Sequence, residues 1–185
     1  MKNIQLPQIT KDRLLELKVG ESGNIIIPIS EEIEVIINNN TDKEYGDCLR
    51  YKDKSDGHIS IRSYDEFFKK WSLLQQGDKF YIGEEFAIYK NPFGSQSIIS
   101  YGTWKSNLYI GDKSEVQSAN QMQPHQSRFQ GECLNVEVVK MQDIQPRNIL
   151  INYHRIFAEH NKLHNTTVTP SMDDYVFLLE VRRDK

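Results

Sequence analysis

The chain has 185 residues, of which 38% are hydrophobic and 26% are charged, and its formal net charge is -3. This composition excludes a disordered chain and is typical of one folded domain that buries a hydrophobic core. The negative charge argues against nucleic-acid binding through bulk electrostatics and leaves only a local basic surface for that purpose.

The first part of the chain predicts short elements separated by polar turns. We expect a helix that is capped by Thr10 and continues through Leu17, with Gly20 after its end. The elements expected next are strands over 24–29, 33–37 and 58–62, a turn over 38–42 and an exposed loop over 43–57.

A second helix begins with a capping box. Ser63 and Glu66 have the spacing at which a serine hydroxyl and a glutamate carboxylate satisfy opposite backbone donors. Apolar residues then recur at helical spacing and define one face, which consists of Tyr64, Phe67, Phe68, Trp71 and Leu74. We expect this helix to end before Gly77.

The rest of the chain predicts mainly strands. We expect strands over 79–89, 97–101, 107–110, 131–141 and 175–181, an extended loop over 112–126, and a helix after Pro146 with Ile149, Tyr153, Ile156 and Phe157 on one face. In the strand over 131–141, Leu134, Val136 and Val138 share one face. Because strands and helices do not alternate regularly, we expect an α+β fold with a curled, largely antiparallel sheet and about three packed helices.

The sequence predicts a single cytoplasmic domain over residues 1–185. Cys48 and Cys133 lie far apart in the chain, which is typical of reduced thiols. The first residues lack the long apolar region of a secretory signal, and no apolar run is long enough to span a membrane.

Three segments together resemble one protein family. Residues 77–84 (Gly-Asp-Lys-Phe-Tyr-Ile-Gly-Glu), the pair Ser127-Arg128 and residues 136–144 are similar to elements of PUA-like proteins of the ASCH type. The similarity is strongest over 77–185 and points to the phage-encoded branch that is often labelled morphogenesis-related. It implies a PUA-like β pseudo-barrel and a small phage- or prophage-type accessory protein.

The N-terminal signature of that family is not retained. The family has a glycine followed by lysine, threonine and arginines, whereas residues 20–28 keep only the glycine and the proline. Gly83 also stands where an arginine is usual. Some ASCH proteins resemble acetylcytidine amidohydrolases that use a lysine, a threonine and a glutamate, and only the glutamate matches here, as Glu84.

Two adjacent carboxylates lie in the strand predicted over 79–89. Side chains of neighbouring strand residues face opposite sides of a sheet, so Glu84 and Glu85 cannot act as a paired dyad. One of them can face inward, where burial would suit a general acid or base. In the alternative interpretation, one carboxylate is exposed and the other is held by a structural partner such as Arg128.

Aromatic residues cluster around glycines in the central strands. Such residues can stack nucleic-acid bases, and nearby lysines can contact phosphates, although aromatic residues also simply fill cores. The candidate ligand-binding residues are Lys79, Glu84, Tyr101, Trp104, Lys105 and Arg128.

His160 and His164 have the spacing of two metal ligands on one helical face. The alternative is a solvated helix end, which we favour, and we expect neither a metal nor another cofactor. We assign no catalytic residue.

Three functions remain open. In the first, the protein binds single-stranded RNA, DNA or a nucleotide in a β-barrel cleft. In the second, the scaffold has lost its ligand pocket and binds a host or phage protein. In the third, the protein hydrolyses a modified nucleoside. None of these involves a membrane.

Overall fold

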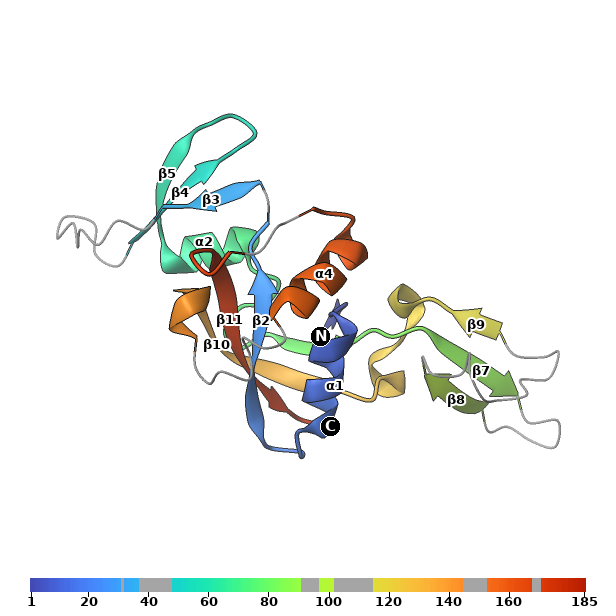
Figure 1. The fold of residues 1–185 in the computed structure, drawn as a ribbon. Helices are drawn as coiled ribbons and strands as arrows, with labels where there is room; N and C mark the ends of the chain where they lie inside the picture. The colour runs from blue at the N-terminus through green and yellow to red at the C-terminus, as the bar shows by residue number, and fades with distance from the viewer. Residues whose placement is uncertain (31, 37–47, 91–96, 102–114, 145–152, 168–170) are drawn as a thin grey trace.

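The structure is a computed structural model that describes residues 1–30, 32–36, 48–90, 97–101, 115–144, 153–167 and 171–185, with the backbone alone at 89–90, 97–101, 115 and 153. These residues form three sheets and three α-helices (Figure 1), which confirms the predicted α+β class. None of the three described sheets closes on itself as a barrel.

A five-stranded sheet forms the centre of the molecule. Its strands, in spatial order, are β1 (Lys2–Ile4), β6 (Lys79–Ile82), β10 (Gln130–Lys140), β11 (Tyr175–Arg183) and β2 (Ser22–Pro28). β1 and β6 are parallel, and the other neighbours are antiparallel. The long pairing of β10 with β11 brings the two halves of the sheet together.

Two three-stranded sheets lie beside the central one. The first consists of β3 (Ile33–Val35), β4 (Cys48–Asp53) and β5 (Ile59–Ser63). The second consists of β8 (Ser97–Tyr101), β7 (Phe86–Lys90) and β9 (Glu115–Gln117). We call the second the wing sheet because it projects from the rest of the molecule in Figure 1.

Two predicted loops contain regular structure. β4 lies in the loop expected over 43–57, because Leu49 and Tyr51 are buried and alternate with exposed or half-buried polar neighbours. The loop expected over 112–126 contains β9 and the 3-10 turns Ala119–Gln121 and Pro124–Gln126. The turn expected over 38–42 and the strand expected over 107–110 lie outside the described residues.

The helices are α1 (Gln8–Glu16), α2 (Tyr64–Trp71) and α4 (Tyr153–His164). α2 begins where predicted, because the Ser63 hydroxyl accepts a hydrogen bond from the Glu66 amide at 3.3 Å, but the described residues show no reciprocal bond to the Glu66 carboxylate. The helix ends at Trp71, so Leu74, which was expected on its apolar face, lies beyond it. Its aromatic face packs on the central sheet, and the Phe67 ring centroid lies 5.9 Å from that of Phe177 on β11.

The predicted cap of α1 is wrong. The helix begins at Gln8, so Thr10 lies inside it, and the buried Thr10 hydroxyl has no hydrogen-bond partner among the described residues. The cap comes instead from α4, where the Glu159 carboxylate accepts a hydrogen bond from the Ile9 amide at 3.1 Å. A carboxylate is favourable at this end of a helix because the first amides are unsatisfied and the helix dipole is positive there.

A β-bulge changes which residues of β10 face the core. The register with β11 shifts between Cys133 and Asn135, so Cys133 and Val136 are both buried. Leu134, which was expected to share a face with Val136, is only half-buried. A bulge adds one residue to one strand and therefore reverses the alternation beyond it.

No helix in the described part of the chain is both long enough and apolar enough to cross a membrane.

The strand predicted over 79–89 is two strands in different sheets. β6 ends at Ile82 and β7 begins at Phe86, and the break is at Gly83, whose amide donates to the Ile4 carbonyl at 2.9 Å. A Cβ at Gly83 would lie 2.3 Å from Asn3 Oδ1 and 2.8 Å from the Ala119 carbonyl. The chain therefore requires glycine here because other segments approach its backbone closely.

We expect Gly83→Ala to lower the free energy of unfolding by about 1–3 kcal/mol, because the added methyl group displaces the Ala119 backbone. Chemical denaturation followed by circular dichroism measures this change. Gly23→Ala is the matched control, since its Cβ would meet only the flexible Leu17 side chain at 3.2 Å. Equal losses in the two variants would contradict the role of Gly83.

Candidate functional site

Two segments cross where the chain passes between the central sheet and the wing sheet. We call residues 83–85 and 127–129 together the junction. Ser127, which is 1% exposed, holds the segments together, because its Oγ lies 2.9 Å from the Ile82 carbonyl and 2.8 Å from the Phe129 carbonyl. Its single hydroxyl hydrogen is donated to these carbonyls, while Oγ accepts from the Phe129 amide at 3.2 Å.

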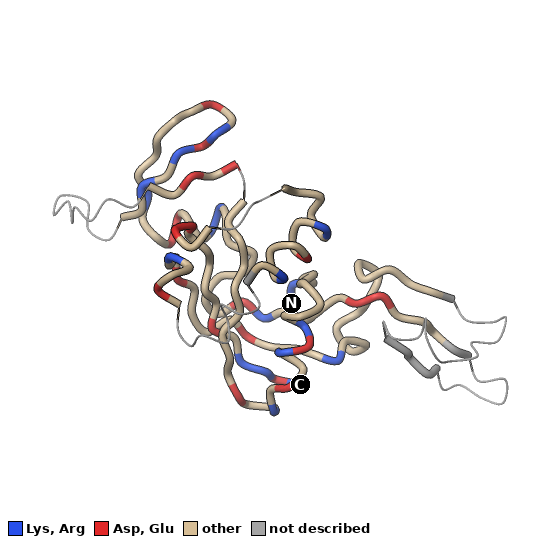
Figure 2. Tube along the Cα trace, viewed as in Figure 1, with Lys and Arg blue, Asp and Glu red and all other residues tan. Residues whose placement is uncertain are grey.

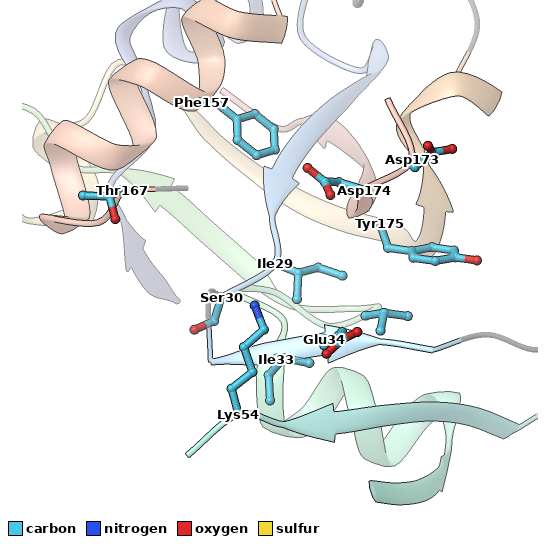
Figure 3. Close-up of a pocket in the computed structure, with 11 residues that line it drawn as sticks. Ile29, Ser30, Ile33, Glu34, Lys54, Phe157, Thr167, Asp173, Asp174 and Tyr175 are labelled. Carbon is cyan, nitrogen blue, oxygen red and sulfur yellow. The ribbon is translucent and has the colours of Figure 1, made fainter. Parts of the chain in front are cut away.

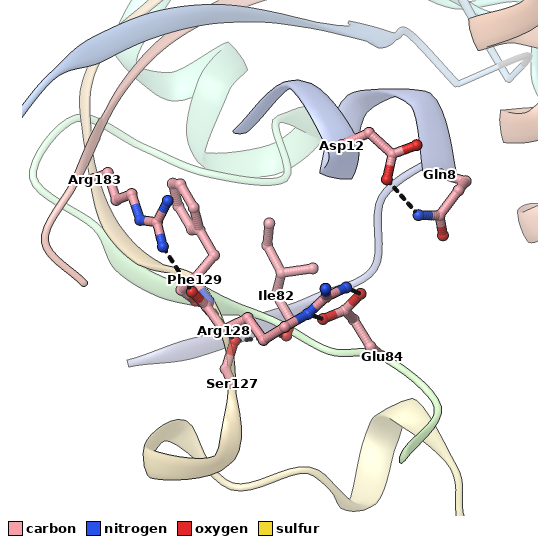
Figure 4. Close-up of polar contacts among 8 residues, drawn as sticks. All are labelled: Gln8, Asp12, Ile82, Glu84, Ser127, Arg128, Phe129 and Arg183. Atoms are coloured by element: carbon pink, nitrogen blue, oxygen red, sulfur yellow. Dashed lines mark hydrogen bonds and ion pairs between the residues drawn. The ribbon is translucent and has the colours of Figure 1, made fainter. Parts of the chain in front are cut away.

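A bidentate ion pair closes the junction. Arg128 Nε donates to Glu84 Oε2 at 2.9 Å, and its Nη2 donates to Oε1 at 2.6 Å (Figure 4). The Glu84 residue is 5% exposed, whereas the Arg128 side chain is 39% exposed. The carboxylate therefore fixes the guanidinium, while part of the Arg128 side chain stays open to solvent.

This arrangement matches the interpretation in which Arg128 holds one of the two carboxylates. Glu84 is buried and Glu85 is exposed, as alternation in a strand would give. Both residues nevertheless lie in the connection between β6 and β7, so the strand predicted through them is wrong.

The half-buried Lys11 lies near enough to the junction for the charges there to act on its pKa, and the sequence did not indicate it. Lys11 belongs to α1, and the charges of Glu84 and Arg128 act in opposite directions on the pKa of its ammonium. Burial lowers the pKa of the Lys11 ammonium, and Arg128 lowers it further, against the opposing effects of Glu84, Asp12 and Glu85. Among the described residues, no hydrogen bond or ion pair engages its Nζ. Nothing in the local sequence links Lys11 to Glu84, because only tertiary packing brings α1 to the junction.

Arg183 connects the junction to the end of α1. Its Nη1 donates to the Leu15 carbonyl at 2.9 Å and to the Leu17 carbonyl at 2.7 Å. Its Nη2 donates to the Arg128 carbonyl at 3.2 Å, and its guanidinium lies over the Phe129 ring. A cation at the carbonyl end of a helix is favourable, and here it also fixes the backbone that carries Arg128.

Of the four other predicted site residues, Lys79 is the one whose side chain the structure describes, and it lies away from the junction. Lys79 is exposed at the opposite end of β6, about 16 Å along an extended chain from Glu84. The backbone of Tyr101 pairs with Phe86 next to the junction, and its side chain lies outside the described atoms. Trp104 and Lys105 lie outside the described residues.

The described residues contain no cluster of three side chains that could bind a metal. His160 and His164 therefore have no third ligand among them. The two imidazole centroids are 4.4 Å apart. The neighbouring Glu159 is engaged by the Ile9 amide and by Arg155 Nε at 3.0 Å. Burial and the adjacent His164 lower the pKa of His160 to about 4.

In comparisons with known proteins, no family model matches the chain, and neither a curated protein nor a solved structure shows significant similarity to it.

We expect Arg128→Met to destabilise the protein more than Glu84→Gln. Removing the arginine leaves a carboxylate buried without its cation, at a cost of about 3 kcal/mol, whereas removing the charge of Glu84 leaves a partly solvated guanidinium, at about 1–2 kcal/mol. Urea denaturation measures both changes. The exposed neighbour variant Glu85→Gln is the control and should change stability by less than about 0.5 kcal/mol. If Glu84→Gln and Glu85→Gln have the same effect, the ion pair does not stabilise the junction.

Stability should fall as the pH drops from about 6.5 to about 4. The folded state binds a proton at His160 less readily than the unfolded state does, so acid favours unfolding within this window. At 1.36 kcal/mol per pKa unit the full shift corresponds to about 3.4 kcal/mol, and because His160 is only half-buried, solvent screening reduces the expected loss to about 1–3 kcal/mol. Thermal unfolding across this range should therefore be less pH-dependent in His160→Gln than in the wild type. The exposed-histidine variant His58→Gln is the control, and it should keep the wild-type profile.

Proposed function

We propose that the protein binds a nucleotide or a short single-stranded nucleic acid at the junction. The observation that carries this proposal is the Arg128 guanidinium fixed on the buried Glu84 carboxylate, with Lys11 near enough for both charges to act on its pKa. Arg128 is held in a bidentate contact and is still 39% exposed. A guanidinium fixed in this way loses little conformational entropy when it binds an anionic group.

The charges around Lys11 favour a nucleotide over a bare phosphate. Asp12, Glu84 and Glu85 lie near enough to influence its pKa, so the site carries acceptors as well as donors. A nucleotide offers matching groups, because its phosphate accepts from cations and its base presents both donors and acceptors. Acidic and basic segments are also interspersed in Figure 2, which supports local recognition over binding by a broad basic surface.

The same contact supports the proposed relationship to PUA-like proteins of the ASCH type. Glu84 and the pair Ser127-Arg128 belong to separate motifs of that resemblance, and they meet in space. On this proposal the central sheet is the pseudo-barrel of a PUA-like domain, and the protein is a phage- or prophage-type accessory protein. Tyr101, Trp104 and Lys105 stay predicted contacts of the ligand.

A second candidate function, hydrolysis of a modified nucleoside, is favoured by Lys11. An amine with a lowered pKa is a better general base near neutral pH than an ordinary lysine. The sequence alone offers Glu84 but no partner base, and on this candidate function Lys11 is that base.

We expect fluorescein-labelled single-stranded RNA or DNA of eight nucleotides to bind more tightly than the matching duplex in anisotropy titrations. Lys11→Met should weaken binding at least fivefold. It should also reduce the slope of log affinity against log salt concentration by about one, the value for one lost phosphate contact. Lys69→Met, which removes an exposed lysine from α2, is the charge-matched control and should leave affinity unchanged.

Equal losses in the Lys11 and Lys69 variants would contradict the proposed site. Absence of binding by every oligonucleotide and by nucleoside monophosphates would contradict nucleotide binding itself. If acylated nucleosides are then turned over by the wild type and not by Lys11→Met, the hydrolase is the correct function.

A further inference from the structure

A cleft of about 590 Å³ that shares no residue with the junction is lined by β3, by residues that follow β2 and β4, and by α4 and the start of β11. Figure 3 shows Phe157, Asp174 and Tyr175 on one side of it and Ile33, Glu34 and Lys54 on the other. Its volume is in the range of sites that hold a small ligand or a few side chains.

The cleft combines an apolar wall with a negative charge. Ile29, Ile33, Val35 and Phe157 supply the apolar surface. Its described lining residues include three carboxylates (Glu34, Asp173 and Asp174) and one ammonium (Lys54), so their formal charge is −2. Asp174 Oδ2 accepts from the Ser171 amide at 2.6 Å, and within the described chain none of the four side chains forms an ion pair, so a bound cation would meet an excess of negative charge.

The wall formed by β3 also presents unpaired backbone groups. β3 is an edge strand of its sheet. The Ile36 amide donates to the Arg50 carbonyl and the Lys54 amide donates to the Glu32 carbonyl, each at 2.8 Å, so the even-numbered residues bond to β4. In an antiparallel pair, alternate residues point their amide and carbonyl groups away from the partner strand.

Ile33 and Val35 therefore direct their backbone groups toward the open edge. The Ile33 amide is already engaged by the Ser30 carbonyl at 3.0 Å. The Ile33 carbonyl, the Val35 amide and the Val35 carbonyl are left for another strand, and no described strand pairs with this edge. Both residues also line the cleft.

We infer that β3 and this cleft receive an extended, basic peptide segment of a partner protein. The peptide adds a strand at Val35 through its backbone, which is a known mode of peptide recognition. A lysine or arginine side chain of the peptide enters the cleft, where its stem lies on the apolar wall and its charge faces Glu34, Asp173 and Asp174. Charge complementarity selects a basic segment, and the open edge selects an extended one.

The test uses three fluorescein-labelled nonapeptides and the full chain. The first peptide alternates lysine and valine, the second alternates glutamate and valine, and the third is the lysine peptide with every backbone amide methylated. We expect the first to bind with an affinity in the micromolar range. The second and third should bind at least tenfold more weakly, because each lacks one of the two features that the site recognises.

Two variants test the same site from the protein. Val35→Pro removes the outward amide without removing a bond to β4, and Glu34→Gln with Asp173→Asn removes two negative charges. Each should weaken binding of the lysine peptide at least fivefold. Ile61→Pro is the matched control, because Ile61 has an outward amide on β5, the opposite edge of the same sheet.

The inference is overturned if the lysine peptide does not bind at millimolar concentration. It is also overturned if the lysine and glutamate peptides bind equally, or if Ile61→Pro weakens binding as much as Val35→Pro does. The methylated peptide keeps the test decisive if Val35→Pro fails to fold, since that comparison needs only the wild-type protein. None of these outcomes depends on nucleotide binding at the junction.

Discussion

The ion pair between Glu84 and Arg128 is the constraint on which the arrangement of the sheets depends. A carboxylate that is 5% exposed requires a compensating cation, and Arg128 is the one that reaches it. Because Glu84 follows β6 and Arg128 precedes β10, their contact fixes where the chain leaves the central sheet and where it returns. The Ser127 hydroxyl and the Gly83 backbone permit the close crossing that this pairing needs.

Holding Arg128 in place has a second consequence. An arginine that serves only as a structural counterion could be fully covered, whereas the Arg128 side chain is 39% exposed and its charge acts on the pKa of Lys11. The junction can thus act as a structural joint and as a ligand site at once. The cleft beside β3 differs from the junction because it adjoins an open strand edge, in addition to the excess of carboxylates among its described lining residues. We therefore propose different partners for the two surfaces, a nucleotide for the first and a basic peptide for the second.

Local signals predicted the elements that local chemistry decides. The Ser63 cap, the aromatic face of α2 and the strands with apolar alternation follow from patterns within a few residues. Features set by tertiary contacts were missed. Glu159 caps α1 from another helix, a bulge after Cys133 changes the buried face of β10, and Gly83 ends β6 because other segments crowd it. The site shows the same limit, since Glu84 and Arg128 were both candidates and Lys11 was not.

We propose that Arg128 and Lys11 together contact an anionic ligand while Glu84 keeps Arg128 in place. The most direct measurement is a side-chain NMR titration that follows the Arg128 Nε–H and Lys11 Nζ signals as a single-stranded octanucleotide is added. We predict a resolved Arg128 Nε–H signal in the free protein, because that N–H donates a hydrogen bond to Glu84. Adding the octanucleotide should then shift the signals of both Arg128 and Lys11. Shifts confined to other lysines and arginines, with Arg128 and Lys11 unchanged, would contradict this proposal.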